Sequence, residues 1–242
     1  MTDFAVSVNG VTKEFILYHN RNYNLKEKLI GLVSGQFREK KEHFRALDDV
    51  SIDVRQGEAV GLLGHNGSGK STLLKLIAGI LKPTTGTIAI NGRIAPFIEL
   101  GVGFNPQLTG EENIFLNGTL YGCTNQQLKA LYDDIVEFSE LGDFIDIPLK
   151  NYSSGMQMRL GFSIAVHLEP TILLADEVLA VGDVSFQEKC LDRIRLLRAK
   201  GMTLILVSHS EDMVHDFCDR FFELEHGKVI RSGTTKRNQT DG

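Results

Sequence analysis

The sequence predicts an α/β fold with a mainly parallel sheet, and three short segments carry that prediction. Residues 58–63, 171–175 and 202–207 are nearly continuous apolar runs that include β-branched residues. Such runs are typical of parallel strands that helices cover on both faces. The stretches between them have helical periodicity, so strands and helices alternate along the chain as a parallel sheet requires.

The remaining elements follow from local signals. An alternating run at residues 4–8, followed by Asn9 and Gly10, predicts a first strand that ends in a turn. Further strands are predicted at residues 47–54 and 87–90. Helices are predicted at residues 72–79, 110–141, 159–167 and 186–199. The polar tail from 234 to 242 is predicted to be frayed.

Composition limits the class of protein. The 242 residues suffice for one large domain or two small ones, and 42% hydrophobic and 24% charged residues are ordinary for a soluble protein. The net charge of −5 argues against nucleic-acid binding over the whole surface. Cys123, Cys190 and Cys218 are widely spaced, which favours reduced thiols in a cytosolic protein. The N-terminus lacks a signal peptide pattern and no apolar run approaches the ~18 residues that span a bilayer, so a membrane role requires a partner chain.

Residues 64–71 carry the strongest motif, because they fit the pattern G-x-x-x-x-G-K-[ST] between a predicted strand and a predicted helix. Glycines let consecutive backbone N–H groups surround phosphate oxygens, and the helix N-terminus adds partial positive charge. We expect Lys70 to reach the β- and γ-phosphates and the Ser71 hydroxyl to bind Mg²⁺. The alternative is a glycine-rich turn that only connects the strand to the helix. The predicted nucleotide-binding residues are Gly64, His65, Asn66, Gly67, Ser68, Gly69, Lys70, Ser71 and Thr72.

Two carboxylates, Asp176 and Glu177, end the apolar run at 171–175. Downstream of a phosphate loop, the first is expected to hold Mg²⁺ through water. The second is expected to polarise the attacking water as general base. An acidic strand end on the surface is the alternative.

Weaker signals surround this pair. Ser153, Ser154 and Gly155 precede a helix, and such an entry can bind an anion. His209 follows the apolar run at 202–207; a histidine there is more often structural, but here it can contact the γ-phosphate and hold the water for Glu177.

The segment 20–45 has seven Lys/Arg against three Glu, a net charge of +4, and apolar residues at helical spacing. It is either a solvated insertion or a basic amphipathic helix at a membrane surface or a membrane partner.

In this order, the phosphate loop, Tyr152-Ser153-Ser154-Gly155-Met156, Asp176-Glu177, Asp183 and His209 resemble the ATP-binding subunit of an ABC transporter over nearly the whole chain. The resemblance implies one domain, 1–242, with an N-terminal antiparallel β part and a helical subdomain at about 104–165. It implies a homodimer that closes head to tail over two ATP molecules. Further ATP contacts then come from Ser153, Ser154, Gly155, Met156 and Asp183.

Several positions depart from the commonest family pattern. The signature reads Tyr-Ser-Ser-Gly-Met instead of Leu-Ser-Gly-Gly-Gln, Val178 replaces a proline, and Glu99 replaces a glutamine that binds Mg²⁺, a role that Glu99 can also fill. Together with the motifs at 99–106, 109–114 and 175–183, these features resemble the branch that exports polysaccharides. In that branch the basic segment 20–45 is a helix that faces the membrane subunit.

The resemblance also gives expectations about partners. It predicts a peripheral subunit at the cytoplasmic face of the bacterial inner membrane, beneath two copies of a permease and without nucleic acid. The cargo is a lipid-linked polysaccharide: O-antigen first, with capsule or teichoic acid as alternatives. The chain ends nine residues after Gly233, so we expect the permease to contact the substrate. A soluble ABC ATPase and a regulator without turnover are the distant alternatives.

The aromatic residue that stacks on adenine in the family is matched by Phe15, with Tyr18 as the rival. A plain core position is the alternative for Phe15.

Overall fold

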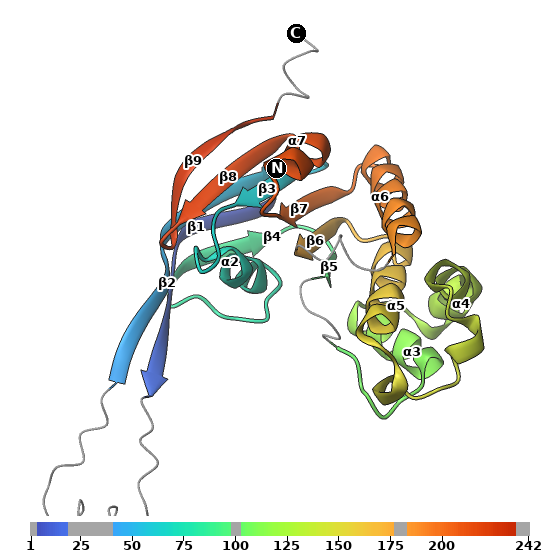
Figure 1. Ribbon diagram of the computed structural model, residues 1–242. Coiled ribbons are helices and arrows are strands. Elements are labelled where there is room, and N and C mark those ends of the chain that lie inside the picture. Colours follow the sequence, from blue (N-terminus) through green and yellow to red (C-terminus); the bar gives the residue numbers. More distant parts are fainter. Residues whose placement is uncertain (1–3, 19–40, 98–102, 177–182, 236–242) are drawn as a thin grey trace, which may run out of the picture.

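The computed structural model describes residues 4–18, 41–97, 103–176 and 183–235 (Figure 1). Its strands are β1 (Phe4–Tyr18), β2 (Lys41–Arg55), β3 (Ala59–Leu63), β4 (Thr85–Ile90), β5 (Ile94–Phe97), β6 (Ile172–Asp176), β7 (Thr203–Val207), β8 (Arg220–Glu225) and β9 (Lys228–Thr234). Its α-helices are α2 (Lys70–Ile77), α3 (Gly110–Leu120), α4 (Asn125–Ser139), α5 (Ser154–His167), α6 (Val184–Ala199) and α7 (Glu211–Phe217). Short 3-10 helices cover Gly142–Phe144 and Leu149–Asn151.

The strands form two sheets. A six-stranded sheet has the order β5-β6-β7-β3-β8-β9, in which all neighbours are parallel except β8 and β9. A three-stranded antiparallel sheet has the order β2-β1-β4. The three apolar runs are β3, β6 and β7, which lie side by side in the larger sheet. The predicted α/β fold, with its antiparallel part and its helices, is confirmed.

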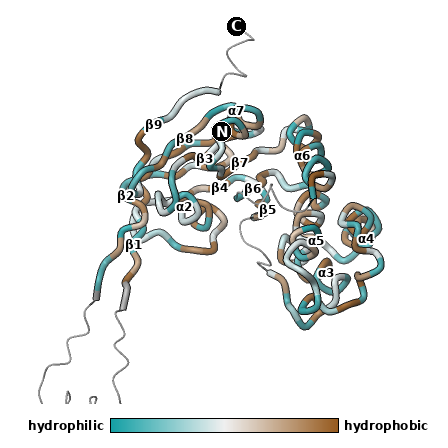
Figure 2. Tube along the Cα trace, in the orientation of Figure 1, coloured by the Kyte–Doolittle hydropathy of each residue, from teal (hydrophilic) through white to brown (hydrophobic). Residues whose placement is uncertain are grey.

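Strands β3, β6 and β7 of the larger sheet are buried on both faces, as their continuous apolar sequences require. Ile172 and Leu174 of β6 pack in a core with α2 and the antiparallel sheet. Leu173 and Ala175, which point the other way, pack in a second core with α5, α6 and α7. A third cluster joins α3, α4 and α5, which we call the three-helix region. Figure 2 shows hydrophobic and hydrophilic residues mixed along these helices, as is typical of helices with one buried face.

The predicted turn at Asn9-Gly10 is wrong. Strand β1 continues to Tyr18, and Gly10 adopts a left-handed φ of 57° at a shift, between Val8 and Val11, in the pairing with β2. A β-bulge absorbs this local conformation without ending the strand.

Two predicted helices also have different limits. Residues 41–45, the end of the basic segment, form the start of strand β2 and not a helix. They pair with β1, and the two strands extend beyond the sheet as a long ribbon (Figure 1). The single helix predicted at 110–141 is two helices, α3 and α4. They are separated around Gly122, whose φ is 82°. Thr124 caps α4, accepting a hydrogen bond from the backbone of Gln127.

Four elements were not predicted: β5, α7, β8 and β9. Strand β5 contains Pro96 and lies at the sheet edge, where proline is tolerated. Strands β8 and β9 are joined through His226 and Gly227, both with positive φ. A non-glycine residue in that conformation is a weaker hairpin signal than Asn-Gly.

All three cysteines are buried and none forms a disulfide. Burial raises the pKa of Cys190 and of Cys218 to about 12, so both thiols stay protonated at neutral pH. Among the described residues, every helix is too short or too polar to cross a bilayer.

Candidate functional site

A cavity of about 350 Å³ lies where the loop after β3 meets the N-terminus of α2. Its lining residues are Phe44, Ala46, Asn66, Gly67, Ser68, Gly69, Lys70, Ser71, Thr72 and Asp176. The loop needs its glycines: a Cβ at Gly64, with φ of 140°, would collide with the carbonyl oxygen of Leu224. A Cβ at Gly69, with φ of 110°, would lie 2.8 Å from the carbonyl oxygen of Ala46. The predicted phosphate loop therefore forms a pocket against β2.

The N-terminus of α2 differs from those of the other described α-helices. Side chains of Thr109, Thr124, Ser153, Asp183 and Ser210 accept hydrogen bonds from the first turns of α3 to α7. Gly69 precedes α2 and provides no side-chain cap. The first backbone N–H groups of a helix need acceptors, and an anion such as phosphate can supply them.

Lys70 places its charge at the base of the loop. Its Nζ donates hydrogen bonds to the carbonyl oxygens of Gly64, at 2.6 Å, and His65, at 2.9 Å. The residue is only 5% exposed, so the ammonium depends on these partners. Gly64 and His65 thus contribute carbonyl groups that orient Lys70, although they do not line the cavity.

Ser71 and Asp176 meet across the cavity. The Ser71 hydroxyl donates to Asp176 Oδ2 at 3.2 Å, which joins the start of α2 to the end of β6. Hydroxyl and carboxylate oxygens are the ligands that Mg²⁺ prefers, and this ion usually keeps several waters or phosphate oxygens as well. No cluster of three His, Cys, Asp or Glu that could hold a metal occurs within the described ranges. The pair therefore fits a Mg²⁺ ion that is also held by a bound nucleotide.

His209 lies beside the same loop. It follows β7, which neighbours β3 in the sheet, and its Nδ1 is 3.2 Å from the carbonyl oxygen of Gly64. The imidazole is thus held at the first residue of the loop.

Other predicted site residues lie elsewhere in the single chain. Ser153, Ser154, Gly155 and Met156 are at the N-terminus of α5, well apart from α2 (Figure 1). The Ser153 hydroxyl accepts a hydrogen bond from the backbone N–H of Met156 at 3.2 Å. Asp183 caps α6 through the backbone N–H of Phe186 at 2.9 Å. None of these residues lines the cavity.

The aromatic wall of the cavity is Phe44, which is not among the site residues predicted from the sequence. Phe44 is 49% exposed. Its cross-strand partner in β1 is Phe15, which is absent from the lining and has Lys13 Nζ 5.1 Å from its ring centroid. Directly paired residues share one face of an antiparallel ladder, so the pairing register is the signal that relates Phe44 to Phe15.

Some predicted residues lie outside the part of the chain that the structure describes. They are Glu177, Glu99, Val178, the side chain of Tyr18, and residues 20–40 of the basic segment.

Comparison with known proteins gives consistent results. Residues 47–180 match the ABC transporter family. The chain is 45% identical to an O-antigen export system ATP-binding protein, RfbB, of Klebsiella pneumoniae, over 96% of this chain and 95% of that protein. It is also 45% identical to the teichoic acids export ATP-binding protein TagH of Listeria monocytogenes, over 97% of this chain and 68% of that protein.

Solved structures share the fold. A structure described as the ATP-binding subunit of an ABC transporter has a TM-score of 0.77 at 26% identity, over 98% of this chain and 93% of that one. The cassette MJ0796, solved as a dimer bound to ADP and phosphate, has a TM-score of 0.76 at 23% identity, over 96% of this chain and 99% of that one.

Proposed function

Because the chain belongs to the ATP-binding proteins of ABC transporters, we propose that it powers export of a lipid-linked polysaccharide, with O-antigen as the first candidate cargo. The observation that carries this proposal is the 45% identity to an O-antigen export protein over nearly the full length of both chains. Teichoic acid is the second candidate, because a teichoic acid export protein is equally identical to this chain. We expect a peripheral subunit bound to a permease at the cytoplasmic face of the membrane.

The phosphate loop binds the nucleotide. Backbone N–H groups at the start of α2 donate to the β-phosphate, and Lys70 neutralises the β- and γ-phosphates. The hydrogen bonds of Lys70 to Gly64 and His65 support this role, because they hold the ammonium beside the N–H groups that face the same pocket.

Hydrolysis needs a polarised γ-phosphate and an activated water. Bound Mg²⁺ would supply charge neutralisation at the β- and γ-phosphates, and Ser71 and Asp176 would hold it, with Glu99 as a further ligand. Glu177 acts as general base for the attacking water. His209, oriented by the Gly64 carbonyl, holds the γ-phosphate and the water in line.

A second copy of the chain completes each site. Ser153, Ser154, Gly155, Met156 and Asp183 lie away from the cavity of their own chain, which supports a role across a head-to-tail dimer. The Ser153 hydroxyl accepts a bond from Met156 N–H and still has its own hydrogen to donate to a phosphate oxygen of the partner's ATP. Closure over ATP and release after hydrolysis would move the permease, with the basic segment 20–45 facing it.

The position of Phe44 predicts which aromatic residue supports adenine. We expect Phe44→Ala to raise the Kd for ATP roughly fivefold, because an aromatic contact is worth about 1 kcal/mol. We expect Phe15→Ala to change it less than about twofold. Titration with a fluorescent ATP analogue measures both, and Phe144→Ala, an exposed ring in the three-helix region, is the matched control. The reverse order would assign the contact to Phe15.

Deletion of the gene in its host tests the export function. We expect one class of surface glycan to disappear while finished, lipid-linked polymer accumulates inside the cell. Restoration by the wild-type gene, but not by the Lys70→Met variant, ties the loss to ATP binding, and the accumulated polymer identifies the cargo. Unchanged surface glycans in the deletion strain would refute polysaccharide export while leaving the ATPase fold intact.

A further inference from the structure

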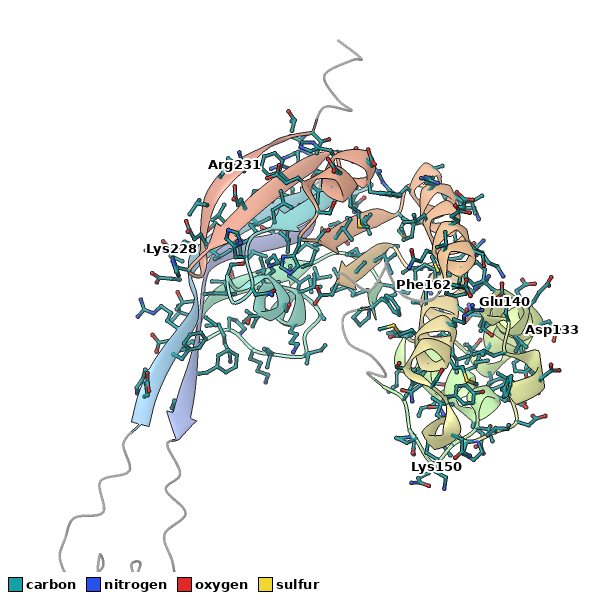
Figure 3. The ribbon with its side chains drawn as sticks, in the orientation of Figure 1. Asp133, Glu140, Lys150, Phe162, Lys228 and Arg231 are labelled. Atoms are coloured by element: carbon teal, nitrogen blue, oxygen red, sulfur yellow. The ribbon has the colours of Figure 1, made fainter. Side chains whose placement is uncertain are left out.

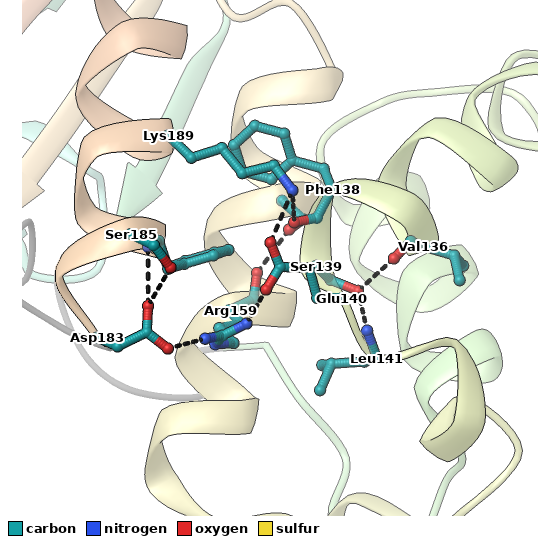
Figure 4. Close-up of polar contacts among 11 residues, drawn as sticks. Val136, Phe138, Ser139, Glu140, Leu141, Arg159, Asp183, Ser185 and Lys189 are labelled. Carbon is teal, nitrogen blue, oxygen red and sulfur yellow. Dashed lines mark hydrogen bonds and ion pairs between the residues drawn. The ribbon is translucent and has the colours of Figure 1, made fainter.

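Arg159 connects three helices through one guanidinium group (Figure 4). The residue lies on α5, six positions after Ser153, and only 17% of its side chain is exposed. One terminal nitrogen, Nη2, contacts Asp183 Oδ2 at 2.6 Å, and the other, Nη1, contacts a carboxylate oxygen of Glu140. Glu140 ends α4 and Asp183 begins α6, so each arm of the guanidinium holds a different helix terminus.

One aromatic ring packs against this guanidinium. The Arg159 Cζ lies 4.6 Å from the centroid of the Phe186 ring. Phe186 also donates its backbone N–H to Asp183, at 2.9 Å, so the same residue supports both members of the ion pair. The Phe186 ring contacts Phe138 of α4, which stacks on Phe162 of α5. Figure 3 labels Phe162 at α5 and Glu140 on the side toward α4.

Lys189 of α6 completes the network. Its Nζ contacts Glu140 Oε1 at 3.1 Å and donates to the carbonyl oxygen of Phe138 at 3.0 Å. The hydrogen bond from Lys189, together with Arg159, holds the pKa of Glu140 below its usual range. The Phe186 N–H, the Ser185 hydroxyl and Arg159 do the same for the pKa of Asp183. Both carboxylates therefore stay ionised at neutral pH.

The two carboxylates that Arg159 contacts lie at different distances in the sequence from the proposed general base, Glu177. The Asp183 arm reaches a residue that lies six positions downstream of Glu177 in the sequence. The Glu140 arm reaches only the end of α4. Since a helix is stiff over six residues, about 9 Å, a shift of the α5 N-terminus moves the guanidinium with it.

We propose that Arg159 is a positioning residue that transmits the placement of Ser153–Gly155 to Asp183 through the shared guanidinium. This inference rests on the proposed function, in which Ser153–Gly155 contact the partner's ATP and Glu177 activates water. When Ser153–Gly155 contact the partner's nucleotide, the Arg159 guanidinium therefore fixes the start of α6 in the same subunit as Arg159. The Glu140 arm and Lys189 instead join the end of α4 to α5 and α6, which supports the fold and leaves the Asp183 contact independent.

Arg159→Lys tests the proposal, because one ammonium cannot bind two carboxylates in a fork and stack on a ring as a guanidinium does. In the full exporter complex, we expect kcat per ATP to fall about tenfold or more, as displacements near 1 Å can cost that much or more. The Kd of the isolated chain for ATP should change less than twofold, since the phosphate loop is untouched. Glu140→Gln is the matched control: it removes the charge of the other arm and leaves the Asp183 arm intact, and we expect kcat to change less than twofold.

Thermal melting separates positioning from simple support of the fold. We expect Arg159→Lys and Glu140→Gln to lower the Tm by similar amounts while only Arg159→Lys lowers kcat. Equal loss of kcat in both variants, or unchanged kcat in Arg159→Lys, would overturn the positioning role. ATP hydrolysis by the wild-type complex tests the proposed function separately. If the wild-type complex does not hydrolyse ATP, the proposed function is wrong. If the wild type hydrolyses ATP and Arg159→Lys has the same kcat, only the role of Arg159 is wrong.

Discussion

Lys70→Met is expected to reduce ATP turnover at least ~100-fold, because it removes the positive charge that faces the transferred phosphate. Methionine retains much of the apolar stem, so the buried position stays filled. The carbonyl oxygens of Gly64 and His65 lose the ammonium that holds them, at 2.6 and 2.9 Å. We therefore expect weaker ATP binding as well as slower hydrolysis. Phosphate release by the full chain, with and without its permease, measures the rate.

The control for this variant is Lys129→Met, which removes an exposed charge on α4. Its turnover should match the wild type. A circular dichroism melt confirms that Lys70→Met is folded. Turnover within threefold of the wild type in a folded Lys70→Met variant would show that the loop binds phosphate without this ammonium, and the proposed role of Lys70 would be discarded.

Glu177→Gln is expected to trap the dimer. Loss of the general base should lower hydrolysis by about 10²-fold or more, while ATP binding is preserved because the phosphate loop is intact. A closed dimer that does not hydrolyse its nucleotide accumulates, so size-exclusion chromatography with ATP and Mg²⁺ should shift from monomer to dimer. ADP should not produce the shift.

Glu225→Gln, an exposed carboxylate at the end of β8, is the matched control and should behave as the wild type does. A second comparison uses Asp176→Asn, which we expect to lower the Mg²⁺ dependence of binding and not to stabilise the dimer. Normal hydrolysis by Glu177→Gln would remove this residue from its role as base. A different group would then have to activate the attacking water.

Local sequence was sufficient for the elements whose signals lie within one segment. Strands β3, β6 and β7 were predictable because burial on both faces leaves a continuous apolar run. Strand β1 was predicted too short because the bulge at Gly10 has the same local signature as a turn. Strand β2 was likewise predicted too short at its start, where the charged residues of its protruding end pair with β1 in the antiparallel ribbon.

The residues of the candidate site also differ in how far local sequence predicts them. Residues Asn66 to Thr72 were predictable because they are contiguous and their chemistry is encoded in the loop itself. Phe44 enters the cavity only through the register of β1 on β2, which no single segment reveals. The Arg159 network joins three successive α-helices through residues 19 and 24 positions apart, and no periodicity within one helix relates Glu140 or Asp183 to Arg159.

The missing side-chain cap on α2 has a consequence for the lifetime of the protein. If the nucleotide supplies the acceptors that other helices obtain from Ser, Thr or Asp, the phosphate is part of the folded structure that α2 stabilises. A ligand at 100 times its Kd adds about 2.7 kcal/mol to the free energy of unfolding. ADP would then protect the folded chain from proteolysis as ATP does, because both nucleotides carry the β-phosphate that faces the start of α2.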